Sequence, residues 1–292
     1  MAYVALVVGV MGVSVSAILV RWSAAPALAL VFYRLILAEI LLLPLAIIRD
    51  RVAWKDVSRR DVMTAMISGV CLSLHFITWV SSLNYTSVAS SVALVSIHPI
   101  LVVIASAVVL GHSLKPGAVV GVVVAVLGSI IIPLGSYAAE SRALTGDVLA
   151  LSGAFFMALY LLFGAHLRQR WSLWMYTSLV YGVAGVVTGL AAVGSGIPLG
   201  GYPAREWMIF VGLAVFPTLL GHTVFNWALG RLPTALVALS ILGEPIGAAV
   251  LAWMLLGEGV PFFTWVGGTM ILVGLARFLF SQSRPEVKQV GV

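Results

Sequence analysis

Residues 87–110 read SVASSVALVSIHPILVVIASAVVL, and residues 233–256 read PTALVALSILGEPIGAAVLAWMLL. Each stretch is 24 residues long and has a proline at its thirteenth position, Pro99 in the first and Pro245 in the second. A helix of about 20 apolar residues crosses the hydrocarbon core of a bilayer. Both stretches are therefore predicted to span a membrane. Each proline should interrupt its helix near the middle and leave carbonyls of the preceding turn without their usual N–H partners.

The rest of the chain has the same apolar character. Hydrophobic residues make up 62% of the 292 positions and charged residues only 9%, whereas about a quarter of the residues in a soluble domain are charged. The apolar runs lie at residues 4–20, 27–48, 62–83, 87–110, 117–134, 147–167, 172–193, 206–228, 235–256 and 263–280. We expect an all-α, polytopic membrane protein with ten transmembrane helices and no large soluble domain.

The two stretches quoted above belong to a longer internal repeat. When the sequence is shifted by 146 residues, half its length, the fourth and fifth apolar runs superpose on the ninth and tenth without a gap. The matching pairs include Ala89 and Ala235, Pro99 and Pro245, Gly121 and Gly267, and Gly128 and Gly274. Because five spans per half is an odd number, the two copies must insert in opposite orientations, a design typical of alternating access. The predicted parts are a first five-helix repeat (1–135), an external linker (136–144), a second five-helix repeat (145–280) and a cytoplasmic tail (281–292).

The formal net charge is +6, but the basic residues are too scattered to form a nucleic-acid groove, so we expect no nucleic-acid partner. Their distribution predicts the orientation of the chain instead. Twelve Lys and Arg residues fall on one side of the predicted spans and three on the other, and basic loops favour the cytoplasmic side. Both termini are therefore predicted to be cytoplasmic in a multi-pass protein of the cell membrane, with the first apolar run retained as a span.

Three motifs then point to a family. Phe32-Tyr33-Arg34-Leu35 lies in the second apolar run, Glu244-Pro245 lies in the ninth, and Leu256-Gly257-Glu258 ends the ninth. With these motifs the chain resembles the EamA-type carriers of the drug/metabolite transporter superfamily, although His112 stands where the first repeat of that family usually has a glutamate. The resemblance implies a secondary transporter that exports small organic metabolites such as amino acids, with a small-molecule substrate and membrane lipids as its partners.

Polar residues inside the predicted spans are the candidates for a substrate site, because such residues need a cavity or a partner within hydrocarbon. His75 and Thr78 belong to a polar stripe on the third run, formed by Thr64, Ser68, Cys71, His75, Thr78 and Ser82 at spacings of three and four. Thr218, His222 and Asn226 form a similar stripe on the eighth run. Stripes of this kind either line a transport cavity or bond to their own backbone and to neighbouring helices.

The repeat adds further candidates for substrate binding. Ser14 aligns with Tyr160, and both are predicted to face the central space. His98 and Glu244 precede the two midspan prolines at corresponding positions, so each places a titratable group beside freed carbonyls. Trp79 lies one turn from His75 and is a candidate wall on which a substrate could stack.

The second run contains Arg34 and Glu39, which point to different sides of a helix because five residues correspond to about 140° around its axis. Glu39, halfway across the span, and Glu244 are the candidates for binding a proton or another coupling ion. Arg34 is predicted to have a structural role and to reach the lipid headgroups.

No motif for nucleotide hydrolysis, dinucleotide binding, a serine nucleophile or a zinc protease is found in the chain. The single cysteine, Cys71, excludes an intramolecular disulfide, and the five histidines have no metal-ligand spacing. We therefore expect no enzyme activity, no cofactor and no metal. Two alternatives stay open: a channel or lipid-translocating protein, since the polar stripes could line a pore, and an intramembrane enzyme based on Cys71 and His75.

Overall fold

The structure is a computed structural model that describes residues 2–50, 57–110, 115–139, 141–168, 170–228, 240–241 and 243–283. Every regular element in these ranges is a helix, so the predicted all-α class is confirmed for the described part of the chain. The elements are α1 (Ala2–Ser14), α2 (Ser16–Trp22), α3 (Ala27–Arg49), α4 (Arg59–Ser82), α5 (Val88–Val95), α6 (His98–Leu110), α7 (Pro116–Ala139), α8 (Ser141–Arg168), α9 (Leu173–Gly194), α10 (Ala204–Leu213), the π-helix η2 (Ala214–Thr223), α11 (Val224–Ala228), α13 (Gly243–Leu256) and α14 (Phe262–Ser283).

Many of these helices are apolar enough to cross a bilayer. Within the described ranges, seven helical segments are also long enough: Tyr3–Trp22, Ala27–Arg49, Arg59–Ser82, Arg142–Gly164, Leu173–Gly194, Ala204–Thr223 and Phe262–Ser281. Three shorter apolar helices are Val88–Val102, Pro116–Ile132 and Gly243–Leu256. Each of these segments overlaps one of the apolar runs in the sequence. The chain is therefore a multi-pass membrane protein.

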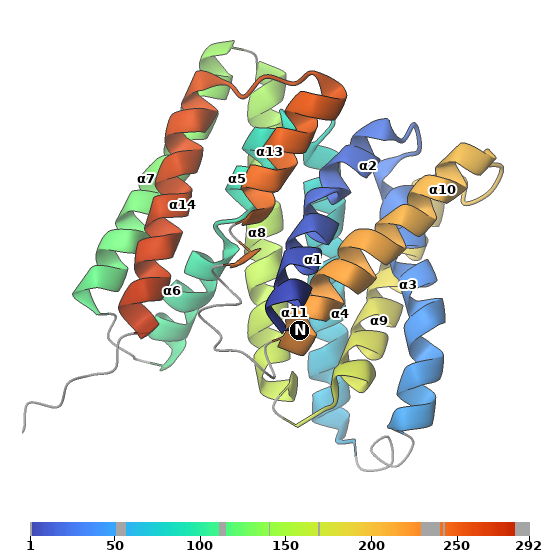
Figure 1. The fold of residues 1–292 in the computed structure, drawn as a ribbon. Helices are drawn as coiled ribbons and strands as arrows, with labels where there is room; N and C mark the ends of the chain where they lie inside the picture. Colours follow the sequence, from blue (N-terminus) through green and yellow to red (C-terminus); the bar gives the residue numbers. More distant parts are fainter. Residues whose placement is uncertain are drawn as a thin grey trace, which may run out of the picture.

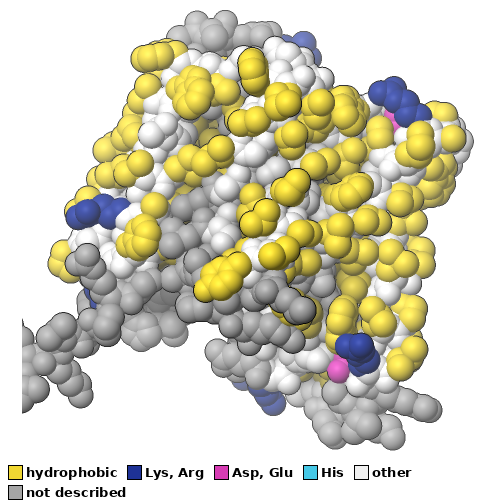
Figure 2. All heavy atoms as spheres, viewed as in Figure 1, with side chains coloured by type: hydrophobic (Ala, Val, Ile, Leu, Met, Phe, Trp, Pro, Cys, Tyr) yellow, Lys and Arg dark blue, Asp and Glu magenta, His cyan; other side chains and the backbone are white. Residues whose placement is uncertain are grey.

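The outside of the helix bundle is apolar. Tyr3 and Met11 on α1, Leu190 on α9 and Met208 on α10 are each more than 60% exposed. Figure 2 shows hydrophobic side chains spread over the middle of one face, whereas the few Lys and Arg side chains lie toward its upper and lower ends and at its left edge. This distribution matches a belt of lipid chains around the middle of the protein.

The chain runs back and forth between two ends of the bundle (Figure 1). The α2–α3, α9–α10 and α13–α14 connections lie at the upper end of the view, and the start of α1 and the last turn of α14 lie toward the lower end. Helices from the two halves of the sequence pack together throughout: α4 on α8 and α9, α3 on α9, and α1 on η2 and α13. The core of the protein is thus built between the halves and not within each half alone.

Glycines hold α7 and α14 close together at one side of the molecule (Figure 1). A Cβ atom added to Gly121 would lie 2.6 Å from the carbonyl oxygen of Gly274, and one added to Gly128 would lie 2.5 Å from that of Gly267. Small residues allow such an approach between helix backbones in a membrane. Any side chain at these positions would push the two helices apart.

Candidate functional site

A small polar cavity lies between the two halves of the chain. It is lined by Val13, Ser16, Arg34, His75, Phe76, Trp79, Val95, Ser96, His98, Met157, Pro217, His222 and Glu244. The centre of a water molecule can occupy about 40 Å³ of this cavity, which is room for about three waters. An amino acid does not fit into this volume.

Arg34, on α3, is the buried cation of the cavity. Its residue surface is only 1% exposed. Nε donates to Oγ1 of Thr218 at 2.9 Å, and Nη1 donates to Oγ of Ser16 at 3.3 Å. The guanidinium carbon also lies 4.0 Å from the centroid of the Phe76 ring, which adds a cation–π contact.

The prediction that Arg34 reaches the lipid headgroups is wrong. The helix α3 turns this side chain into the bundle, where hydroxyls and an aromatic ring replace water around the guanidinium. Arg34 is also absent from the substrate-site candidates derived from the sequence. The signal that could have identified it is a lone arginine within an apolar run, since such a charge needs a partner or a cavity.

Pro217 explains how Thr218 comes to bind Arg34. A proline has no N–H, so the carbonyl of Leu213 loses its usual helical donor, and the chain continues as the π-helix η2. Oγ1 of Thr218 donates to this carbonyl at 2.9 Å while it accepts from Arg34. Farther along η2, Oγ1 of Thr223 donates to the carbonyl of Thr218 at 3.1 Å. A π-helical turn is rare and is frequently found at functional sites.

Pro99 interrupts the chain in a similar way in the first half. Helix α5 ends at Val95 and α6 begins at His98, so the break lies beside the predicted proline. Pro99 cannot donate to the carbonyl of Val95, and Nδ1 of His98 donates to it instead at 3.0 Å. His98 therefore caps the freed carbonyl from a position in the cavity wall. In the second half, residues 229–239 and 242 lie outside the described ranges.

His75 and Trp79 form one wall of the cavity. Nδ1 of His75 donates to the carbonyl of Gly153 on α8 at 2.9 Å, so this histidine links the two halves. Its ring is parallel to that of Trp79, with 6.4 Å between the centroids and 5° between the planes. Nε1 of Trp79 is a buried donor without a hydrogen-bond partner in the described part of the chain.

The second half contributes His222 from η2 and Glu244 from the first turn of α13. The His222 ring lies edge-on to Phe76, with 6.2 Å between the centroids. Glu244 interacts electrostatically with Arg34, but within the described ranges the ion pairs are formed by other residues. One small cavity thus contains a cation and a carboxyl group that do not contact each other.

Other candidates lie outside the residues that line the cavity. Ser14 and Thr78 each donate to the carbonyl four residues earlier in their own helix, at 2.8 Å, which is the backbone-bonding alternative for the polar stripes. Tyr160 is buried against Tyr176, with 6.4 Å between the ring centroids. Asn226 belongs to α11, but its side chain lies outside what the structure describes.

Glu39 also lies away from the cavity, on the side of α3 that faces α9. Oε1 of Glu39 accepts a hydrogen bond from Ser178. Oε2 is buried and has no hydrogen-bond partner among the described residues. Glu39 and Arg34 therefore have different surroundings, in agreement with the angle between them on the helix.

Paired charges occur at the upper end of the bundle. Arg21 forms an ion pair with Glu258, which follows α13, and also donates to the carbonyl of Thr86 at 3.3 Å. The second carboxylate oxygen of Glu258 accepts from the backbone N–H of Val88 at 2.9 Å. Glu206 on α10 accepts from the turn between α2 and α3 in the same manner. These contacts tie both halves of the chain together at this end.

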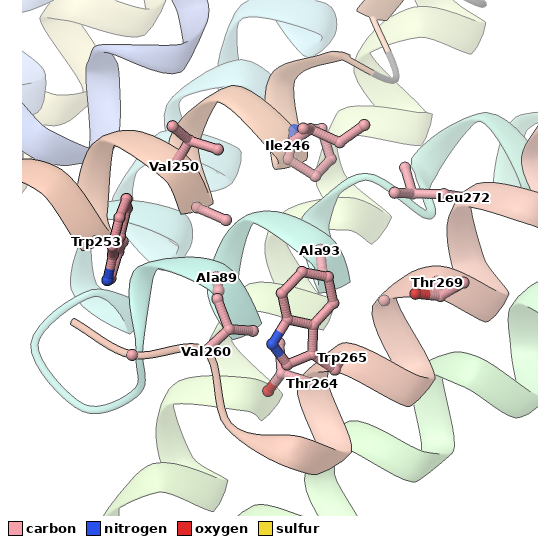
Figure 3. Close-up of a pocket in the computed structure, with 14 residues that line it drawn as sticks. Ala89, Ala93, Ile246, Val250, Trp253, Val260, Thr264, Trp265, Thr269 and Leu272 are labelled. Carbon is pink, nitrogen blue, oxygen red and sulfur yellow. The ribbon is translucent and has the colours of Figure 1, made fainter.

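A larger hollow lies between α5, α13 and α14, with room of about 430 Å³ against about 40 Å³ in the polar cavity. Figure 3 shows Trp253 of α13 and Trp265 of α14 on either side of it, with Ala89 of α5 between them in this view. The two tryptophans are 66% and 63% exposed, and the lining contains no charged side chain. Its chemistry fits lipid chains, whereas the small cavity has the groups that recognise a polar solute.

Comparison with known proteins gives a consistent assignment. The EamA-like transporter family matches residues 1–134 and again residues 144–280. An uncharacterized transporter from Archaeoglobus fulgidus is 26% identical over 262 residues, which cover 85% of this chain and 87% of that protein. A protein of known crystal structure superposes with a TM-score of 0.66 over 97% of this chain and 99% of its own. At 17% identity, this last match shows a shared fold alone.

Proposed function

Since the chain belongs to the EamA-like transporter family and is a membrane transporter, we propose that it is a secondary active carrier that exports small organic metabolites, such as amino acids, by alternating access. The observation that supports this most directly is the shared cavity. Arg34 and His75 come from the first family match, and His222 and Glu244 come from the second. A site between two repeats can open to either side in turn when the repeats rock against each other.

The proposed architecture has ten transmembrane helices in two inverted repeats, residues 1–135 and 145–280, joined by a linker at 136–144. A shift of 146 residues relates α1 to α8, α4 to the segment with η2, α6 to α13, and α7 to α14. Under this relation the packing of α4 on α8 corresponds to that of η2 on α1, and the packing of α6 on α8 corresponds to that of α13 on α1.

The glycine contacts support the inversion as well. Gly121 faces Gly274 and Gly128 faces Gly267, so the residue numbers rise along α7 where they fall along α14. Two equivalent helices that pack antiparallel are what a twofold axis in the membrane plane produces.

The excess of basic residues on one side supports a cytoplasmic position for both termini and for residues 281–292 in a cell-membrane protein. In this orientation the end with Arg21 and Glu258 is external. We assign their ion pair and the contacts around it to an outer gate, which is closed in this structure. The gate must open before a substrate is released, because the cavity in its present state is too small for a substrate to pass through.

Within the cavity, the proposed substrate contacts are His75, Trp79, His98 and His222. Nδ1 of His75 and of His98 is already used by a backbone carbonyl, so Nε2 is the ring nitrogen that remains for a substrate. Ser14, Thr78, Tyr160 and Asn226 stay predictions of further contacts, to be tested in an open conformation.

Two carboxyl groups are proposed to couple transport to a proton or another ion. Glu244 lines the cavity, where ion binding and substrate binding can influence each other directly. Glu39 lies in the same helix as Arg34 and has a buried oxygen without a partner in the described chain. A carboxyl group in this setting can take up and release a proton without breaking an ion pair.

Counterflow in proteoliposomes tests the proposed function. Vesicles that contain the purified protein are loaded with an unlabelled solute, and uptake of the same labelled solute is measured for a panel of amino acids, nucleosides, sugars and amines. We expect saturable uptake that the internal solute stimulates. Uptake no greater than in empty liposomes for the whole panel would remove the carrier hypothesis.

A channel or a lipid-translocating protein is the second candidate function. The exposed apolar hollow in Figure 3 favours the lipid alternative. Channels do not give trans-stimulated exchange, so the counterflow assay separates a channel from a carrier. Translocation of a fluorescent phospholipid in the same vesicles tests the lipid alternative, and we expect no increase over empty liposomes.

A further inference from the structure

The charges in the central cavity are arranged in an unusual way. Arg34 and Glu244 line the same small space and interact electrostatically, yet among the described residues the ion pairs are Arg21 with Glu258 and Arg170 with Asp61. Isolated charges in a membrane interior are costly, so such residues normally pair with each other or serve a functional site. A cation and a carboxyl group that are kept apart leave space for a ligand with both charges.

The surroundings of Arg34 favour a carboxylate as its ligand. Its side chain donates hydrogen bonds to two neutral hydroxyls, those of Ser16 and Thr218, and its guanidinium lies over the ring of Phe76. A guanidinium presents donors in a planar fork that matches the two oxygens of a carboxylate. Trp79 lines the same cavity and has a buried Nε1 donor without a partner in the described chain. This part of the cavity therefore offers hydrogen-bond donors and has no negatively charged acceptor among these neighbours.

Glu244 is the only carboxyl group that lines the cavity in the described chain. Carboxylate oxygens only accept hydrogen bonds when ionised, and an ammonium group only donates them. His75 and His98 add one unused ring nitrogen each, because Nδ1 is bonded to a carbonyl in both cases. The acceptors needed for an ammonium group are thus available in the same space as the donors needed for a carboxylate.

Apart from the polar side chains of Ser96 and His222, the remaining lining is apolar. Val13, Phe76, Val95 and Met157 contribute hydrocarbon, sulfur and ring surface to the cavity. Such a lining accommodates an aliphatic or aromatic side chain and disfavours a third charge, because a charged group gains little from apolar neighbours.

We propose that the cavity is a zwitterion site, in which Arg34 binds the carboxylate and Glu244 binds the ammonium group of an α-amino acid with an apolar side chain. This inference rests on the proposed carrier function and defines its substrate class. Neither charge of the amino acid is then left without an opposite charge in the membrane interior. A solute with only one of the two charges leaves either Arg34 or Glu244 without its partner.

The test compares amino acids with analogues that lack one charged group. Counterflow is measured with three series: L-leucine, isopentylamine and 4-methylpentanoate; L-phenylalanine, 2-phenylethylamine and 3-phenylpropanoate; and L-methionine with its decarboxylated and deaminated analogues. At least one amino acid should be transported about tenfold faster, or more, than both of its analogues, because each analogue leaves one charge of the site unpaired. The zwitterion site is excluded if, in every series whose amino acid is transported, the counterflow rate of at least one single-charge analogue is within tenfold of that of the amino acid.

Variants of the two charged residues should change selectivity in opposite directions. Arg34→Gln should remove the preference for the amino acid over the amine, and Glu244→Gln should remove the preference over the carboxylate. A residue with a structural role alone would reduce all three rates by the same factor, and this outcome would contradict the proposal. Arg170→Gln is the matched control, since Arg170 is an exposed arginine paired with Asp61, and its selectivity should equal that of the unmodified protein.

Two further measurements keep the test decisive. If Arg34→Gln does not yield folded protein, Arg34→Lys replaces it. This variant retains the positive charge and should keep the preference for the amino acid over the amine while lowering the rate of counterflow. The comparison of the analogues on the unmodified protein needs no variant. Transport of sugars, nucleosides or amines, without transport of amino acids, would overturn the zwitterion site and leave the carrier function intact. Absence of counterflow for every solute would overturn the carrier function itself and with it this inference.

Discussion

The upper end of the bundle and the central cavity both contain charged groups, but the two regions arrange them differently. At the upper end Arg21 contacts Glu258 directly, and the carboxylate also accepts a backbone N–H. In the cavity Arg34 and Glu244 share one small space without an ion pair. A direct pair satisfies both charges within the protein, whereas separated charges need a third group. The first arrangement is suited to holding helices together and the second to binding a ligand.

Because the two regions differ in this way, we expect substitutions in them to have different effects. Changes in the cavity should alter transport with little effect on folding, and changes at the upper end should alter the balance between closed and open conformations. Removal of the exposed arginine from the pair of Arg170 with Asp61 should have little effect on either property.

The largest effect is expected for His75→Ala and His222→Ala. Each change removes a ring from the cavity wall, and His75→Ala also removes the hydrogen bond to Gly153 that joins α4 to α8. Loss of one polar contact of this kind corresponds to about a tenfold lower rate of counterflow. Folded protein should be recovered by size-exclusion chromatography in near-normal amount.

The control for these variants is Ser152→Ala, which removes an exposed hydroxyl that bonds to its own helix. It should transport at the normal rate. Unchanged transport in both histidine variants would exclude these residues from the substrate site. The interpretation of the central cavity as a ligand site would then lose this support.

The second prediction concerns Glu39, whose carboxyl group has neither a cation at ion-pair distance within the described chain nor a place in the cavity wall. If Glu39 is the proton-binding group, Glu39→Gln removes the coupling and spares the substrate contacts. Accumulation of an amino acid driven by a pH difference across the vesicle membrane should then disappear, while counterflow without a pH difference should fall by less than about threefold. Equal loss of both activities would instead indicate a structural role for the bond between Glu39 and Ser178.

Several parts of this arrangement could be predicted from the sequence because they depend on local or periodic features. Apolar runs of sufficient length indicate the helices, and Pro99 indicates the break between α5 and α6 because a missing N–H acts within one turn. His75 and His222 were identifiable because they recur at helical spacing with other polar residues. Each of these signals is contained in one segment of chain.

Other parts depend on how the segments pack, and a single segment does not contain that information. The sequence places Arg34 in an apolar run, but only the rotation of α3 against α4 and η2 determines that the side chain enters the cavity. Thr78 shares a predicted face with His75, yet its hydroxyl bonds to its own helix because this partner is always within reach. The π-helix at Pro217 likewise depends on packing and on Thr218, which supplies a substitute donor.

The third prediction addresses the outer gate. Glu258→Gln weakens the pair with Arg21, and a partly exposed pair of this kind contributes about 1 kcal/mol, which corresponds to about a fivefold shift from closed to open conformations. A cysteine placed at Ser96 in the cavity, in a Cys71→Ser background, reports the opening. A membrane-impermeant thiol reagent added from outside should label Glu258→Gln faster than the parent protein.

The exchanged pair, Arg21→Glu with Glu258→Arg, provides the matched control because it restores opposite charges at the same two positions. Labelling should return toward the rate of the parent protein. If the single variant and the exchanged pair both label at the parent rate, the ion pair does not close this end of the cavity.

The smallest effect is expected for Arg170→Gln. Nη1 of Arg170 lies 3.3 Å from Oδ2 of Asp61, and the arginine side chain is 59% exposed whereas the aspartate side chain is 8% exposed, so water screens the arginine end of the pair. Asp61 keeps its position in the first turn of α4, where the helix dipole still stabilises a negative charge. The free energy of unfolding should therefore fall by less than about 1 kcal/mol, seen as a decrease of about 4 °C or less in the Tm, and counterflow should change by less than about twofold. A larger loss would mean that the position of an ion pair in the bundle does not predict its contribution to stability. The difference between the two regions would then be supported by the selectivity of the cavity alone.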